Sequence, residues 1–310
     1  MEILAEKKLK EVLQLIEKGE PLEAQKLIDE LLVQYIDCNE LIYTNRCCIF
    51  LEDSIHRIDS RKDKYVQSEL IFQEWKAFQD FISRESIEYE PALLSVQHGF
   101  FFNALKKLEP LLDEKDLTQR AEYLKKIGMC FKKLGNFERA RTYLSEANNI
   151  CPNVASVLAE LADCYSLCGE DKFGKVLFRE AFFLNPESID IDFLDSQLIK
   201  CLIDITKQKG HTGKLINLWI PIYGVLYGVF NIRRQLNSQE VIKLKKDIYA
   251  IENESKDPSC NEKVLTPQLL NKYFWLIDYY VQTHESNSKI KDVLLKIRLL
   301  DNSVYENYIK

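Results

Sequence analysis

Nine cysteines and four histidines carry the most distinctive chemistry in this 310-residue chain, and metal binding would be their first use. A structural zinc site needs paired Cys-x-x-Cys motifs or histidines close to the cysteines. Cys164 and Cys168 are instead four residues apart, and Cys47 and Cys48 are adjacent. The histidines are scattered over positions 56, 98, 211 and 284. We therefore predict no metal site and no cofactor, and we expect the cysteines to be reduced residues that pack in the interior.

Common catalytic motifs are absent from the sequence. It contains no phosphate-binding GxxxxGK[ST] loop, no GxGxxG after a strand, no HExxH and no GxSxG. Carboxylates and histidines are present, but no spacing singles out a pair for acid–base work. We therefore expect a chain that is not an enzyme. A catalytic site assembled from distant residues would leave no such signal, and it stays an alternative together with a regulatory nucleic-acid protein.

The charge of the chain bears on its partners and its compartment. The formal net charge is −6, whereas general nucleic-acid binding relies on a basic surface. We therefore expect no nucleic-acid partner. The segment Met1 to Lys10 is charged and lacks the apolar core of a secretion signal. An odd number of cysteines without such a signal is typical of a cytoplasmic protein with reduced thiols.

Two consecutive segments, 121–154 and 155–188, repeat one pattern of residues at a spacing of 34. The first carries Leu124, Ile127, Gly128, Phe131, Gly135, Ala140, Leu144, Ala147 and Pro152. The second carries Leu158, Leu161, Ala162, Tyr165, Gly169, Gly174, Phe178, Ala181 and Pro186. Apolar residues at steps of three and four indicate helices, and no convincing alternating run indicates a strand. The pattern predicts an all-α chain.

Each segment is expected to form two antiparallel helices. In the first segment we predict one helix from about Thr118, as its cap, to Leu134, and a second from about Phe137 to Asn149. Gly135 ends the first helix, because glycine tolerates the left-handed conformation of a helix stop. Gly128 and Ala140 are small because the two helix backbones must approach closely there. One such pair cannot bury its apolar face alone, so it needs neighbours.

This pattern of small residues, spacing and terminal proline resembles the tetratricopeptide repeat family. The resemblance implies a right-handed α-solenoid, a superhelix of about five to seven antiparallel helix pairs. It also implies a protein that binds other proteins.

The rest of the chain fits the pattern less well. We predict degenerate helical repeats over 1–84, repeats over 85–188, a divergent helical repeat over 189–237 and capping helices over 238–310. In the repeat that precedes residue 121, we expect Gly99 to form the turn between two helices, because Gly99 and Ala104 are spaced like Gly135 and Ala140.

The resemblance implies that the first helix of each repeat lines a concave groove. The side chains expected to face a partner there are Lys125, Lys126, Met129, Lys132, Lys133, Ser156, Glu160 and Asp163. One wall of the groove is then basic and the next mildly acidic, which suits a partner segment of mixed charge. The other interpretation is a solvated helix face. Met129 and Glu160 depart from the family's carboxylate-binding pattern, which argues against a clamp for a C-terminal carboxylate.

Residues 215–230 form the most apolar stretch of the chain. A transmembrane helix would need about 20 apolar residues, whereas this stretch is shorter and contains Asn217 and Pro221. We therefore predict no transmembrane segment and a buried central helix. The alternative is an exposed apolar patch that contacts a partner, a second copy of the chain or a membrane surface.

Taken together, these features predict a non-enzymatic cytoplasmic scaffold or adaptor. Its partner would be another protein or a peptide segment held in the concave groove. The alternative is a structural subunit of a large assembly that uses the apolar stretch 215–230.

Overall fold

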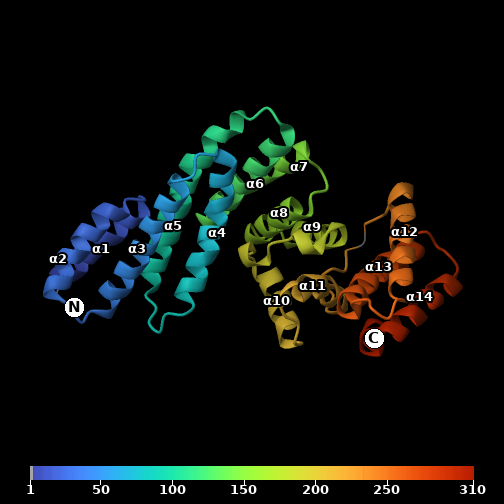
Figure 1. Cartoon of the computed structure of the whole chain (residues 1–310). Coiled ribbons are helices and arrows are strands. Elements are labelled where there is room, and N and C mark those ends of the chain that lie inside the picture. The colour runs from blue at the N-terminus through green and yellow to red at the C-terminus, as the bar shows by residue number, and fades with distance from the viewer. Residues whose placement is uncertain (1–2, 233) are drawn as a thin grey trace. The chain divides into compact units, whose positions relative to one another are not determined.

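The computed structural model describes residues 3–232 and 234–310. Over those residues the chain forms fifteen α-helices and no strand, so the all-α prediction is confirmed. The chain divides into two compact units, Met1–Ile150 and Cys151–Lys310, and each is described by itself (Figure 1).

The first unit contains seven α-helices and one short 3-10 helix. Their bounds are α1 Ile3–Glu17, α2 Pro21–Gln34, α3 Asn39–Asp59, α4 Lys64–Ile82, α5 Glu90–Leu108, η1 Glu109–Asp113, α6 Leu117–Lys133 and α7 Phe137–Ile150. Helix α5 is central, because it packs against α1, α3, α4 and α6. Its apolar side chains Phe100, Phe101 and Leu108 are buried.

Gly99 lies inside α5, so the predicted turn at this residue is wrong. A Cβ atom added to Gly99 would stand 1.9 Å from the carbonyl oxygen of Ile16 in α1. The glycine therefore allows the end of α1 to pass against the middle of α5. Asn103, one turn later, donates from Nδ2 to the carbonyl oxygen of Gly19 at 3.1 Å, which holds the turn after α1 against the same helix.

Helices α6 and α7 form a helical hairpin close to the predicted bounds. Gly135 has a φ of 76°, and the N–H groups of Gly135 and Asn136 bond back to the carbonyl oxygens of Lys132 and Phe131 at 2.9 Å each. This is the hydrogen-bond pattern of a glycine helix stop. The helix cap differs from the prediction, because Asp116 rather than Thr118 accepts the N–H of Gln119. The helix starts one residue earlier than predicted.

The second unit contains eight α-helices and two 3-10 helices. Their bounds are α8 Ala155–Leu167, α9 Asp171–Leu184, η2 Pro186–Ser188, η3 Ile191–Phe193, α10 Gln197–Gln208, α11 Lys214–Leu226, α12 Ser238–Glu254, α13 Glu262–Gln282, α14 Asn287–Leu300 and α15 Asn302–Tyr308. One apolar core joins α8 to α11, and another joins α11 to α15. Helix α11 therefore contributes to both.

Helices α8 and α9 repeat the hairpin of α6 and α7. Gly169 has a φ of 81° and ends α8 with the same pair of backbone hydrogen bonds. The close approach between the two helices occurs at Gly174, whose added Cβ would stand 3.0 Å from the carbonyl oxygen of Ala162. In the first hairpin the matching glycine is Gly128, where an added Cβ would stand 3.2 Å from the carbonyl oxygen of Ala140. The glycine of this contact therefore lies on the first helix in one hairpin, α6, and on the second helix in the other, α9.

None of the helices in the described part of the chain combines the length and the apolar composition needed to cross a bilayer. The apolar stretch 215–230 forms α11 and the turn after it, and Ile220, Ile222 and Phe230 are at most 1% exposed. The prediction of a buried helix is therefore confirmed. Tyr227, at 54%, is its most exposed large side chain.

Candidate functional site

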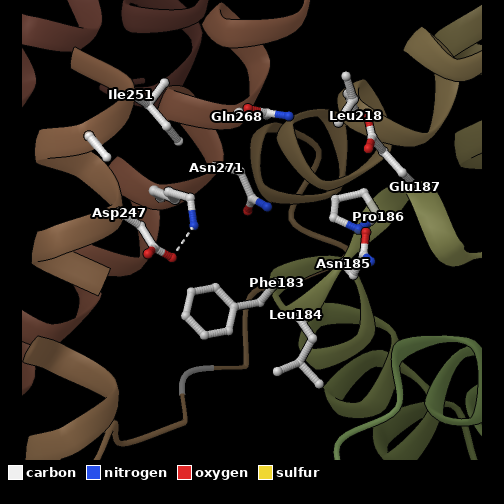
Figure 2. A pocket seen from close by; sticks show the side chains of 12 residues that line it. Phe183, Leu184, Asn185, Pro186, Glu187, Leu218, Asp247, Ile251, Gln268 and Asn271 are labelled. Carbon is white, nitrogen blue, oxygen red and sulfur yellow. Dashed lines mark hydrogen bonds and ion pairs between the residues drawn. The ribbon is translucent and has the colours of Figure 1, made fainter. Parts of the chain in front are cut away.

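A pocket of about 310 Å³ opens in the second unit, where the end of α9 meets α11, α12 and α13 (Figure 2). Its size lies at the lower end of the roughly 300–1,000 Å³ of ligand pockets. The residues that line it are Phe183, Leu184, Asn185, Pro186, Glu187, Leu218, Asp247, Ala250, Ile251, Gln268, Asn271 and Lys272.

Apolar side chains from α9, α11 and α12 form part of the wall, and Leu218 is the contribution of α11. Figure 2 shows Phe183 and Leu184 on one side of the space and Ile251 of α12 on another. The Phe183 ring packs on Trp275, with 4.2 Å between the ring centroids, and this contact fixes the ring. The wall can therefore receive an apolar group without first rearranging.

The pocket exists because of how α9 ends. Pro186 has no N–H, so the carbonyl oxygen of Phe182 lacks the partner that a continuing helix would supply. Asn271 of α13 replaces it, because its Nδ2 donates to that oxygen at 3.0 Å. Asn217 of α11 donates to the carbonyl oxygens of Pro186 and Ile189 at 3.0 and 2.7 Å, which fixes the chain just after the helix.

Asn271 is the polar centre of the pocket. Its side chain points into the middle of the space in Figure 2, and the residue is 7% exposed. Because Nδ2 is bound to Phe182, the orientation of the carboxamide is set, and no described residue donates a hydrogen bond to Oδ1. Oδ1 is not fully enclosed, so a ligand that enters the pocket can donate a hydrogen bond to it in place of solvent.

The charges around the pocket leave it weakly negative. Lys272 and Asp247 neutralise each other through an ion pair of 2.9 Å, drawn as a dashed line in Figure 2. The carboxylate of Glu187 has no cationic partner among the described residues, and its residue is exposed. The carboxyl end of α9 adds the partial negative charge of a helix C-terminus.

The chemistry of this lining is that of binding. Carboxamides, two carboxylates, one ammonium group and apolar groups can hold a ligand by hydrogen bonds, charge and contact area. Among the residues described around the pocket there is no cysteine, serine, threonine or histidine that could serve as a nucleophile. The residues that the structure describes also contain no group of three or more His, Cys, Asp or Glu side chains arranged to hold a metal ion.

A second recess lies in the first unit, between the start of α2 and the end of α3. Its volume is about 650 Å³, and it is lined by Gly19, Glu20, Pro21, Leu22, Glu23, Glu52, Asp53, Ile55, His56 and Asp59. Two of its carboxylates already pair within the chain, Glu23 with Lys26 and Asp59 with Lys107. None of the polar side chains described as lining it is buried. We therefore take the pocket of the second unit as the candidate site.

The basic residues that we predicted to face a partner lie on α6, where Lys125 and Lys126 have charge partners within the first unit. Lys125 pairs with Glu122 at 2.6 Å. Lys126 is 3% exposed, and its ammonium group donates to Ser68 at 2.9 Å and pairs with Glu69. Met129, Lys132 and Lys133 are also buried. The positive charge of Lys126 is therefore used to hold α6 against α4.

The predicted residues of the second unit lie on α8. Asp163 is fully buried, and its two carboxylate oxygens accept the N–H groups of Asp195 and Ser196 at 2.8 Å each. Since Ser196 is the N-cap of α10, this carboxylate fixes the start of that helix. Glu160 is buried and Ser156 is half-buried. That the eight residues together form a binding groove stays a prediction.

None of the residues lining the pocket was predicted as a site. The only local signal is Asn185-Pro186, which marks the end of a helix. Asn271 carries no signal, because an asparagine within an amphipathic helix looks like any polar position. Its importance depends on Phe182, which lies 89 residues earlier in the chain.

Comparison with known proteins gives no family assignment. No family model matches the chain, and no curated protein matches it either.

Proposed function

We propose that this chain is a non-enzymatic cytoplasmic interaction protein that holds a segment of a partner protein. We further propose that its helix pairs belong to the tetratricopeptide repeat type and stack as a right-handed solenoid. The matched helix stops at Gly135 and Gly169 support this architecture, as do the matched close contacts at Gly128 and Gly174.

A single observation carries the binding function. The buried carboxamide of Asn271 presents Oδ1 to a pocket with an apolar wall, and no described residue satisfies that oxygen. A partner segment brings both donors and apolar groups, so it matches this lining. Because Asn271 and Phe183 are held by contacts within the chain, the site is preorganised and loses little conformational entropy when a segment binds.

The alternative, a structural subunit that uses residues 215–230, has less support. Most of this stretch packs into the cores of the second unit, which leaves Tyr227 as its main exposed side chain. In this alternative, replacing Tyr227 by serine would weaken assembly, whereas the same change would leave binding at the pocket intact.

The proposal can be tested with a display library of random 12-residue peptides, selected against the purified full-length chain. Selected peptides are then measured against two tryptophan variants of α12. Ala250→Trp adds a large side chain at an exposed position in the lining of the pocket, and Ile242→Trp adds one at an exposed position of the same helix outside it. We expect binding to fall at least tenfold for Ala250→Trp and to change little for Ile242→Trp.

Three outcomes can be told apart. Loss of binding in Ala250→Trp alone supports the proposed function. Equal binding by both variants would move the interaction to another surface of the chain. A library that yields no binder at all would contradict the function.

A further inference from the structure

We infer that the pocket at the end of α9 receives an arginine side chain of the partner segment. This inference rests on the proposed function and specifies the chemistry of the partner. Its basis is the juxtaposition of an amide acceptor without a donor, a carboxylate without a cationic partner and an aromatic ring in one pocket.

The pocket offers acceptors and one negative charge that no lining residue neutralises. One N–H of the Asn271 Nδ2 group is used by the carbonyl oxygen of Phe182, and Oδ1 accepts no hydrogen bond from a described residue. The ammonium group of Lys272 is held by Asp247, whereas Glu187 offers a carboxylate. The carboxyl end of α9 favours positive charge nearby. A ligand group that brings donors and a positive charge matches these features.

The apolar wall requires that this group also carry a hydrocarbon stem. Phe183, Leu184 and Ile251 would contact such a stem, while the charged end reaches the acceptors. A guanidinium group also binds aromatic faces. The chain itself uses this contact next to the pocket, because the guanidinium carbon of Arg179 lies 4.7 Å from the centre of the Trp275 ring that supports Phe183.

Other side chains meet only part of these requirements. A carboxylate would be repelled by Glu187, and an aliphatic side chain would leave Oδ1 of Asn271 without a donor. Lysine concentrates its charge and donors at one point. The planar guanidinium group spreads five donors in fixed directions, so it can serve acceptors that approach from different sides.

The experiment uses three small probes on the full-length chain. They are N-acetyl-arginine methylamide, its uncharged isostere N-acetyl-citrulline methylamide, and N-acetyl-norleucine methylamide. Binding is followed by nitrogen–proton correlation spectra of the Asn271 side-chain amide, which is assigned by its disappearance in Asn271→Asp. We expect the arginine probe to shift this signal and to compete with a selected peptide. We expect the citrulline probe to bind about two- to fivefold more weakly and the norleucine probe to leave the signal unshifted.

Two matched variants test the charge. Glu187→Gln removes the carboxylate of the pocket, and Glu262→Gln makes the same change at an exposed position of α13 outside it. Both residues are exposed, so neither change should affect folding. We expect Glu187→Gln to weaken the arginine probe about two- to fivefold and Glu262→Gln to leave it unchanged.

The inference is overturned if the norleucine probe binds as tightly as the arginine probe, or if both glutamate variants bind the arginine probe equally. Its failure differs from failure of the proposed function. Selected peptides that bind at the pocket but tolerate arginine-to-norleucine replacement would refute the arginine while keeping the function. A library without binders would refute the function and this inference together.

Discussion

Asn271 Nδ2 donates a hydrogen bond of 3.0 Å to the carbonyl oxygen of Phe182, which lies 89 residues earlier in the chain. The bond replaces the helical partner that Pro186 cannot supply. It also leaves Oδ1 of the same carboxamide facing the pocket. The Asn271 side chain thus satisfies the end of α9 and also supplies an acceptor to the candidate site, so stability and binding are coupled at this residue.

Asn271→Asp should destabilise the second unit by about 1–3 kcal/mol, because the Phe182 carbonyl loses its donor and faces a carboxylate instead. Urea unfolding measures the change. The matched control is Gln268→Glu, one turn earlier on α13, whose amide makes no hydrogen bond to a described residue. There we expect a change below about 0.5 kcal/mol. Equal effects at both positions would contradict the assigned role of Asn271.

Gly99→Ala should destabilise the first unit by about 1–3 kcal/mol, although alanine is the better helix former by about 1 kcal/mol. The reason is steric, because the new Cβ would stand 1.9 Å from the backbone oxygen of Ile16 and α1 would have to move. Leu94→Ala, at an exposed position of the same helix, is the control and should be nearly neutral. Should Gly99→Ala match the wild type in thermal unfolding, the close contact of α1 with α5 would be wrong.

Glu74 makes the stability of the first unit depend on pH. Arg57 donates to its two carboxylate oxygens at 2.8 and 2.7 Å, and Ser54 adds a bond of 3.0 Å. The hydrogen bonds from Arg57 lower the pKa of Glu74 below its ordinary value of 4.5, against the opposing effect of burial. Because the pKa is lower in the folded chain, the stabilisation is present above about pH 4.5. It is lost as the pH falls through the lowered value.

We therefore expect Glu74→Gln to cost about 1–2 kcal/mol at pH 7, a range that allows for the solvent exposure of Arg57. The difference from wild type should shrink as the pH is lowered from 7 towards about 3.5. Denaturant unfolding at several pH values measures it. Glu30→Gln, an exposed change on α2, should show no such trend. A difference for Glu74→Gln that stays constant with pH would argue against the lowered pKa.

Thiol reactivity should follow burial. Burial raises the pKa of Cys47 and Cys48 to about 12 each and also raises that of Cys130, so almost no thiolate forms at pH 8. Cys201 is exposed. With iodoacetamide and peptide mass mapping, we expect Cys201 to be modified first and the three buried thiols only when the chain unfolds. Rapid modification of Cys130 in the folded protein would contradict its buried position.

Sequence reasoning succeeded where structure depends on neighbours along the chain. The helix stops at Gly135 and Gly169 were predictable, because a left-handed residue at a helix end is a local property of glycine. The same reasoning placed Gly99 at a turn, although this residue lies within α5. A glycine that ends a helix and one that admits another helix look alike in a sequence, and only the position of Ile16 separates them.

The residues predicted to line the groove show the same limit more strongly. The family resemblance assigned Lys126 and Asp163 to the face of their helices that lines the predicted groove, but it could not show what covers that face. Lys126 meets Ser68 and Glu69, which lie 58 and 57 residues earlier, and Asp163 meets the start of α10. A charged side chain on a helix faces either solvent or a distant partner, and the sequence pattern is the same in both cases.

The sequence by itself determined that the helices are the only regular elements and that two helical hairpins repeat at 34 residues, and it favoured an interior position for residues 215–230. These properties follow from periodicity, glycine stops and hydrophobicity, which act over a few turns of helix. Only the tertiary structure decided where a ligand could bind. The pocket joins residues 183–187, 218, 247–251 and 268–272. Its central acceptor exists because a proline at the end of one helix left a carbonyl oxygen for an asparagine of another helix to satisfy.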